Sequence, residues 1–270
     1  MSVSKPQRRM ISAKVGLELT QQLGKVGDSF LQELREVLWR AEESAQGSRN
    51  TWARVCLANA MTRRNTAREH VLERVLDAVC ASFMKAAINS KTVLHGAIWK
   101  TEDTLNSSKP DGAPVLVRDA AYNTENREPH VKRIDPSEMV SFGNKEYPKS
   151  HAVAYRCFTT CEPQCITSVK KAMAMDPPQW IPLYAGQEVK YHSMVALPVW
   201  IRPSQRGDEE AVAVFSLDSN QEYFFAENGD WFDLLQPFVR WIAICYEMDQ
   251  MLRNLHSGYL DPRPKESGGT

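Results

Sequence analysis

Three cysteines in one short stretch are the residues best suited to covalent chemistry. Cys157, Cys161 and Cys165 follow one another at intervals of four residues. A helix would place Cys157 and Cys161 on one face, but Pro163 would break that helix before Cys165. Thiol chemistry needs an exposed thiolate of lowered pKa and a resolving partner. The spacing leaves a thiol-based redox enzyme or sensor open, beside the reading we favour, free thiols that merely pack near one another.

Histidines close to these cysteines raise the alternative of a metal site. His151 and His192 could join the three thiols, but their spacing matches no zinc pattern such as paired Cys-x2-Cys motifs. We therefore expect no metal. His192 opens an expected strand, where a structural role competes with a role in binding. His95 interrupts another strand pattern and could face the polar side of a sheet.

Several sequence motifs of well-known enzyme classes are absent. The chain contains no Gly-x-Gly-x-x-Gly, no Gly-x4-Gly-Lys-Ser/Thr and no His-Glu-x-x-His. It also lacks the Gly-x-Ser-x-Gly turn that presents a nucleophilic serine. We therefore expect that the protein is not an enzyme, with the thiol alternative kept open.

The elements that must position these residues can be read from hydrophobic periodicity. A capping box at Thr66 and Glu69 opens an expected helix over 66–88. A final helix is expected over 230–255 with Pro237 inside it, and a short helix over 147–160. Apolar runs predict strands over 92–99, 113–121, 164–169, 192–200 and 211–218. The loops are 122–135 and 170–190. This order predicts an α+β domain whose antiparallel sheet of five or six strands carries helices on one face.

The chain divides into four parts on the same evidence. Residues 1–11 are expected to be a disordered basic tail, and 256–270 a disordered polar tail. Residues 12–65 carry an apolar stripe at helical spacing and form an N-terminal helical region that could dimerise. Residues 66–255 form the domain itself.

Composition limits the function classes further. The 270 residues include 33 basic and 33 acidic side chains, so no basic excess points to a nucleic-acid partner. No apolar run reaches the roughly 18 residues that cross a bilayer, and no signal-peptide core follows the N-terminus. We expect a cytoplasmic protein without nucleic-acid binding or membrane insertion, whose six cysteines form no disulfide framework.

The block from Tyr191 to Asp249 resembles the C-terminal half of a GAF domain. A strand entered by His192-Ser193-Met194 ends at Leu197-Pro198-Val199, and a hairpin leads to a strand ending Leu217-Asp218-Ser219. The aromatic pair Phe224-Phe225, Asp230 and a long helix follow in the order of that family. Residues 150–169 resemble the family's short helix and next strand, 66–121 match only in topology, and 12–64 lie outside the resemblance.

The resemblance implies a six-stranded sheet with a ligand-sized pocket on one side. Family members bind cyclic nucleotides, tetrapyrroles, small metabolites or metal centres, and the fold does not choose among them. The Asn-Lys pair of cyclic-nucleotide binders is replaced by Asp218-Ser219, and Cys157 lacks the adjacent histidine of tetrapyrrole binders. Ligand and cofactor therefore stay unknown. The expected pocket residues are Trp99, Phe142, His151, Tyr155, Cys157, His192 and Asp218.

The function that the sequence favours is sensing or signalling. A small molecule would enter the pocket, and the terminal helices of a homodimer would pass the change to a partner protein. One alternative is a ligand-free protein-interaction module, with residues 12–64 binding the partner. The other is the thiol-based redox enzyme or sensor, in which Cys157 and Cys161 would be essential.

Overall fold

The computed structural model describes residues 68–84, 91–102, 113–123, 131–142, 144–184, 187–201, 210–225 and 230–260. The expected N-terminal helical region over 12–65 and the tail 1–11 lie outside these residues. The last helix continues to Leu260, past the expected start of the C-terminal tail at 256.

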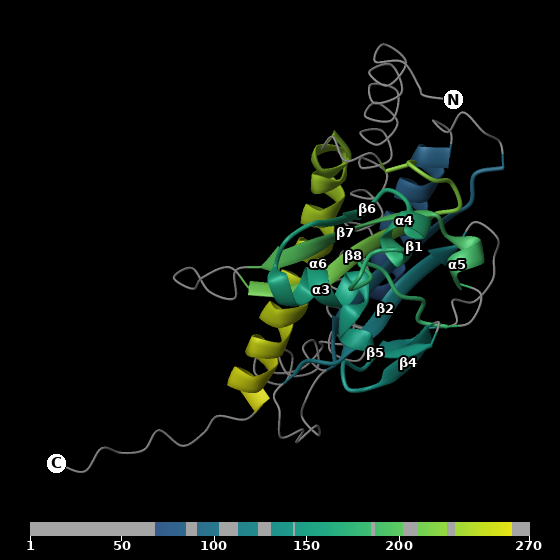
Figure 1. Cartoon of the computed structure of the whole chain (residues 1–270). Helices are drawn as coiled ribbons and strands as arrows, with labels where there is room; N and C mark the ends of the chain where they lie inside the picture. Colours follow the sequence, from purple (N-terminus) through teal and green to yellow (C-terminus); the bar gives the residue numbers. More distant parts are fainter. Residues whose placement is uncertain are drawn as a thin grey trace.

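Six antiparallel strands form the central sheet in the order β3-β2-β1-β8-β7-β6 (Figure 1). Their bounds are β1 Leu94–Thr101, β2 Leu116–Asn123, β3 Arg133–Ile134, β6 Gln164–Ile166, β7 Ser193–Ile201 and β8 Glu210–Ser219. The first and last long hairpins therefore meet at the β1–β8 pair in the middle of the sheet. The predicted α+β class and antiparallel sheet are confirmed.

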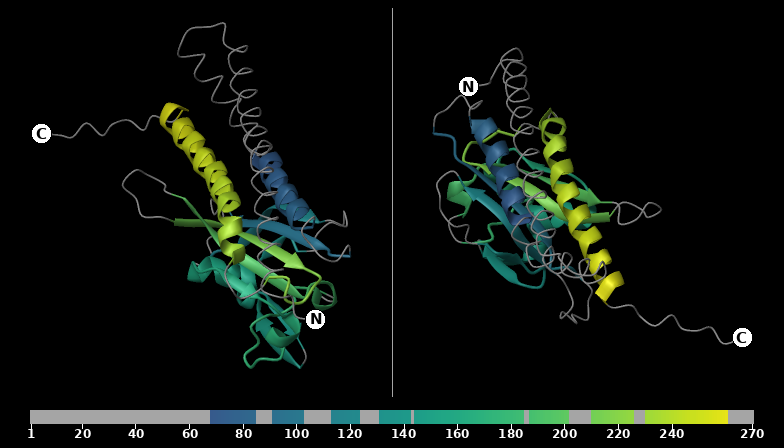
Figure 2. Two further views of the ribbon diagram at one scale, coloured as in Figure 1. Left: turned by 90° about the horizontal axis from the view of Figure 1, so that it is seen from above. Right: turned by 180° about the vertical axis from the view of Figure 1, so that it is seen from behind.

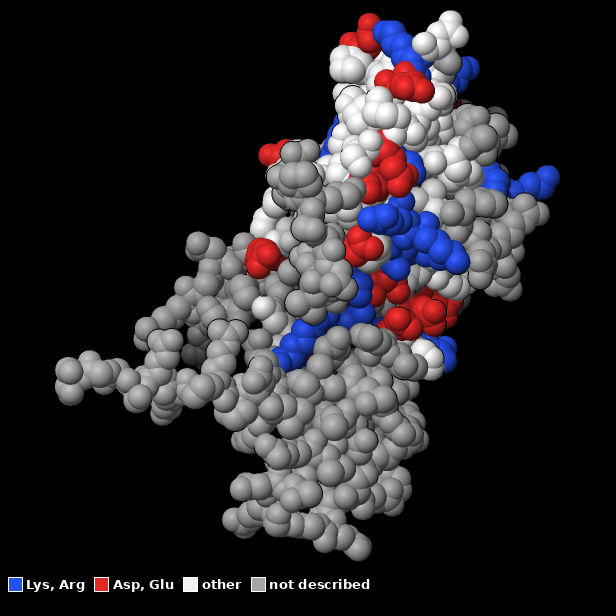
Figure 3. All heavy atoms as spheres, turned by 90° about the horizontal axis from the view of Figure 1, so that it is seen from below, with Lys and Arg blue, Asp and Glu red and all other residues white. Residues whose placement is uncertain are grey.

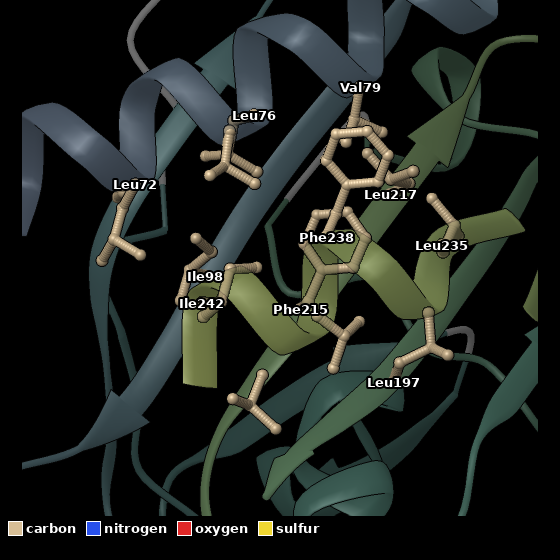
Figure 4. Packing of buried hydrophobic residues seen from close by; sticks show 14 of the residues in the cluster. Leu72, Leu76, Val79, Ile98, Leu197, Phe215, Leu217, Leu235, Phe238 and Ile242 are labelled. Atoms are coloured by element: carbon tan, nitrogen blue, oxygen red, sulfur yellow. The ribbon is translucent and has the colours of Figure 1, made fainter. Parts of the chain in front are cut away.

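Two long helices cover one face of this sheet. The helix over 68–84 and α6, Asp230–Leu260, lie over the same side when the molecule is seen from behind (Figure 2). Figure 4 shows side chains from both helices and from β1, β7 and β8 pointing into one layer. Fully buried members include Leu72, Leu76, Ile98, Phe215 and Phe238. Alternate residues of each strand enter this layer, because successive side chains of a strand point to opposite faces.

Gly96 lets the 68–84 helix approach β1 closely. A Cβ atom at this position would lie 3.0 Å from Leu76 Cδ2, 3.2 Å from Leu217 Cδ2 and 3.4 Å from Cys80 Sγ. A larger residue would push the helix or Leu217 away. The glycine thus couples the helix position to the two central strands.

A buried ionic network also holds the two long helices to the sheet. Arg68 donates from Nε and Nη2 to the Asp119 carboxylate at 2.9 and 3.0 Å, and its Nη1 lies 3.2 Å from Asp249 Oδ2. Lys100 Nζ lies 2.9 Å from Asp119 Oδ1, and the Tyr246 hydroxyl donates to Oδ2 at 2.8 Å. Burial alone would raise the pKa of Asp119, but Arg68, Lys100 and Tyr246 together lower it. Asp119 therefore stays ionised in the folded protein.

Short elements cover the opposite face of the sheet. They are η1 Lys149–His151, α3 Val153–Thr160, α4 Val169–Met173 and α5 Gln187–Lys190, with the hairpin of β4 Met139–Phe142 and β5 Lys145–Pro148 beside them. The predicted helix over 147–160 is wrong at its start: Pro148 ends β5, and α3 begins only at Val153. The predicted loops also contain β3, α4 and α5, which are too short for a periodic signal.

No helix among the described residues is both long and apolar enough to span a bilayer. On the face shown in Figure 3, Lys and Arg side chains of the described residues lie among Asp and Glu side chains.

Candidate functional site

Three strands build the floor of a small cavity on the face covered by the short helices. Cross-strand pairing sets His95, Asp218 and Met194 in one row, and Ala97, Ser216 and Ala196 in the next. A third row contains Trp99, Val214 and Pro198. The middle row carries only small side chains between larger neighbours, so the surface of the sheet is hollowed there. Ala196 and Ser216 both line the resulting cavity, whose volume is about 50 Å³.

Residues from several separate segments form the walls and roof. Trp99 of β1 lines the cavity. So do Ala152, Val153 and Ala154, at the beginning of α3. The segment between α4 and α5 adds a further set of lining residues, Trp180, Ile181 and Leu183. Gln187 of α5 also lines the cavity, and its Oε1 accepts a hydrogen bond from the Leu183 amide at 2.6 Å. Most of the enclosure is therefore apolar.

A buried His–Asp pair lies at one end of the floor. His95 Nδ1 and Asp218 Oδ2 are 3.1 Å apart, and the two side chains are 9% and 10% exposed. Asp218 lines the cavity, whereas the His95 ring lies beside Tyr191, with the ring centroids 5.7 Å apart. His95 Nε2 and Asp218 Oδ1 are buried and have no hydrogen-bond partner among the described residues. Such unsatisfied buried polar atoms are uncommon and costly.

The other polar group of the floor, the Ser216 hydroxyl, both accepts and donates a hydrogen bond. Trp99 Nε1 donates to Ser216 Oγ at 3.2 Å, and Ser216 Oγ donates to the Ala97 carbonyl at 3.3 Å. These bonds fix the indole ring over the sheet. The polarity still available to a ligand on this floor is therefore concentrated at Asp218.

The structure brings two of the seven expected pocket residues, Trp99 and Asp218, into the cavity lining. Tyr155 and Cys157 lie in the same apolar layer but pack within it instead of lining the cavity. Burial raises the pKa of Tyr155, and the charge of Asp135 raises it further.

The other three expected residues lie elsewhere. Phe142 and His151 both lie next to Tyr147 of the β4–β5 hairpin, at ring separations of 6.4 and 6.0 Å. His192 lines a separate, wider cleft of about 530 Å³ together with Lys170 and Glu222, which are exposed. His192 is therefore not brought together with Asp218.

The three clustered cysteines do not share one site. Cys157 belongs to α3 and is buried in the apolar layer between this helix and the sheet. Cys165 instead packs against the layer of the long helices. Cys161 is exposed and caps the C-terminus of α3 at φ 57°. Burial raises the pKa of Cys157 to about 12, with a smaller contribution from the charge of Cys161. A buried thiol of this kind is a poor nucleophile.

Sequence reasoning missed several lining residues. Ser216, Gln187, Ile181 and Leu183 are not among the predicted residues, because nothing local marks them as facing a cavity. His95 was expected on a polar face and is instead buried against Asp218, 123 positions away in the chain. The available signal for a hollow was one small residue among larger ones on the same face of each strand, Ala196 in 192–200 and Ser216 in 211–218. Among the described residues, no group of three or more His, Cys, Asp or Glu side chains is placed to hold a metal ion.

Comparison with other proteins gives similarity in fold. No protein-family model matches this sequence, and no curated protein sequence matches it. A solved GAF domain is similar over 70% of this chain and 88% of its own, at 12% identity and a TM-score of 0.42. The free methionine-R-sulfoxide reductase of Neisseria meningitidis, solved with its substrate, matches over 78% and 95%, at 11% identity and a TM-score of 0.39.

A third solved structure is the GAF domain of the Acinetobacter phosphoenolpyruvate-protein phosphotransferase. It matches over 74% of this chain and 94% of its own, at 14% identity and a TM-score of 0.34. At these values the likenesses say nothing of ligand or activity. The expectation that this chain is not an enzyme stays a prediction. The six-stranded antiparallel sheet, with long helices on one face and a cavity on the other, is the arrangement that the resemblance implies, and in this sense the fold is GAF-like.

Proposed function

We propose that this protein is a sensory domain that binds a small molecule in the cavity between its sheet and helix α3. The observation that supports the proposal best is the cavity over Ala196 and Ser216, which Asp218 lines with a side chain whose Oδ1 is buried and has no hydrogen-bond partner among the described residues. Binding pockets are typically apolar with a few convergent polar groups. A purely structural core would be expected to satisfy that oxygen or to replace it with an apolar side chain.

The size of the cavity limits what can enter without rearrangement. An apolar cavity of roughly 150 Å³ holds benzene, and a water molecule needs at least about 10 Å³. The 50 Å³ present here admits a few waters or a molecule of a few heavy atoms. A larger ligand would have to displace Trp180 and its neighbours, which belong to a segment with little regular structure.

The same strands offer a route from the cavity to the long helices. Gly96 lies between His95 and Ala97 and faces Leu76 and Cys80 of the 68–84 helix. Leu217 lies next to Asp218 and enters the layer of the long helices. A shift of β1 or β8 caused by a ligand would therefore reach both helices. We propose that these helices, with the N-terminal region, pass the change to a partner protein in a homodimer.

A cavity-filling variant tests the proposal. Ala196→Val adds two methyl groups to the floor, and its β-branched side chain suits a strand. We expect fractions of a small-molecule extract from the protein's own cells to raise the melting temperature of the wild-type protein and not of the variant. Wild-type and variant proteins that respond equally to every fraction would contradict a ligand in this cavity.

The second candidate is the ligand-free interaction module, which the small volume of the cavity favours. In that case the core would simply be imperfectly packed, and Ala196→Val would stabilise the protein by filling a void without loss of any response. The same experiment therefore separates the two functions.

A further inference from the structure

Asp218 is the one charged residue that lines the cavity among the described residues. In the tautomer that carries its proton on Nδ1, His95 donates to Asp218 Oδ2, and its Nε2 is then an acceptor. Both unpartnered atoms, His95 Nε2 and Asp218 Oδ1, are then acceptors. No lysine or arginine lines the cavity among the described residues. A buried carboxylate in such surroundings calls for a positively charged donor.

The wall formed by the start of α3 has the complementary character. Residues 152–154 of this wall include the N-cap and first turn of α3, and Ala152 provides no side-chain hydrogen bond to the helix end. The first backbone N–H groups of a helix have no partner within the helix, and the N-terminus carries a partial positive charge. This wall therefore favours a hydrogen-bond acceptor.

We infer that the ligand is a compact ammonium compound with a hydrogen-bond acceptor at its other end. Its ammonium group pairs with Asp218, its acceptor lies toward the first turn of α3, and its carbon chain lies over Ala196 and Ser216. The indole rings of Trp99 and Trp180, which also line the cavity, provide aromatic surface that suits a cation. His95 is a positioning residue that orients the carboxylate. This inference rests on the proposed function, because it assigns a ligand class to the same cavity.

Three probes of nearly equal size test the inference on the full-length protein. They are 2-aminoethanol, which is an ammonium ion at neutral pH, ethylene glycol, which replaces the ammonium by a hydroxyl, and glycolate, which is an anion. A ligand of four heavy atoms binds no tighter than about 0.04 mM. Titrations followed by isothermal calorimetry and by NMR of the tryptophan indole signals must therefore cover millimolar concentrations.

The expected result is saturable binding of 2-aminoethanol, with the other two probes at least roughly tenfold weaker. Asp218→Asn keeps the shape of the side chain and removes its charge, so it should abolish the preference for the ammonium. Asp233→Asn, on the exposed side of α6, is the matched control and should bind as the wild type does. Ala196→Val leaves Asp218 intact and should weaken the binding by filling the floor.

Each other outcome overturns a defined part of the account. If ethylene glycol or glycolate binds as tightly as 2-aminoethanol and Ala196→Val blocks it, the cavity is a ligand site and the ammonium inference is wrong. If 2-aminoethanol binds equally to wild type and Asp218→Asn, Asp218 is not its counter-ion. If no probe binds and the extract fractions also fail to distinguish wild type from Ala196→Val, the inference and the proposed function fall together.

Discussion

At the scale of single residues, the floor of the cavity separates two kinds of polar group. Ser216 has both a donor and an acceptor partner, and so stabilises the position of Trp99. Asp218 has one partner, His95, and leaves its second oxygen unpaired in a buried place. That difference favours a structural role for Ser216 and supports the proposed binding role of Asp218.

Cysteine reactivity can be tested at the same scale. Burial raises the pKa of both Cys157 and Cys245 to about 12, whereas Cys161 is exposed. We expect iodoacetamide to alkylate Cys161 at least roughly a hundredfold faster than Cys157 in the folded protein. Peptide mass spectrometry after short exposures measures the two rates, with unfolded protein as the control. Equal rates would revive Cys157 as a nucleophile and with it the thiol-based alternative.

At the scale of elements, one ionic network and one glycine act together with the apolar layer in attaching the long helices to the sheet. The network joins Arg68 of the 68–84 helix to Asp119 of β2, together with Tyr246 and Asp249 of α6. Gly96 sets how closely the 68–84 helix approaches β1. Both features belong to the path by which a ligand would move the helices.

Asp119→Asn should lower the free energy of unfolding at neutral pH by about 3 kcal/mol, because it leaves buried cationic partners without their counter-charge. The lowered pKa of Asp119 sets the pH dependence. Its contribution is complete above the ordinary value of about 3.9 and is lost as the pH falls through the lower folded value. Urea unfolding should therefore show the difference between wild type and variant shrinking in acid.

Asp176→Asn is the matched control for that experiment. The side chain of Asp176 is 84% exposed, and its ion pair with Lys145 is long at 3.8 Å. We expect no measurable change in stability from this variant. An Asp119→Asn protein as stable as the control would mean that the network does not hold the helices in place.

Gly96→Ala should destabilise the protein by about 1–3 kcal/mol, because the new Cβ would lie 3.0 Å from Leu76 Cδ2 and 3.2 Å from Leu217 Cδ2. Adding Leu76→Ala should relieve part of the clash, so the two changes should cost less together than their separate sum. Thermal or urea unfolding of the four proteins of this cycle gives the coupling. Strict additivity would show that the helix does not press on β1 at this point.

At the scale of the whole molecule, the buried clusters of the described residues are built from residues 71–246. These residues form two layers, one on each side of the sheet. Both layers lie within the predicted extent 66–255, which stays a prediction. The N-terminal helical region over 12–65 remains the predicted site of dimerisation.

Deleting residues 1–64 should abolish dimerisation and leave the domain folded. Analytical ultracentrifugation reports the assembly, and near-ultraviolet circular dichroism reports tryptophan packing, with the full-length chain as the reference. A dimer that survives the deletion would place the interface on the domain itself. A deletion variant without tertiary signal would show that the core depends on the missing region.

The sequence predicted the fold better than the site, for physical reasons. The helices over 68–84 and 230–260 and the strands β1, β2, β7 and β8 show long periodic patterns, which residue type alone creates. The short β3, β4 and β5 offer too few residues for such a pattern. Asp218 and Trp99 were identified as pocket residues, but the partner of Asp218, His95, is 123 residues away and could be found only in the structure.

The most direct measurement is native mass spectrometry of wild type and Ala196→Val purified from the protein's own cells. The proposed function predicts that the wild type carries a small bound mass and that the cavity-filled variant does not. The ammonium inference adds that the bound molecule contains an amine. A wild type without any bound mass, or a mass retained equally by both proteins, would contradict the claim that this cavity is where the protein senses its ligand.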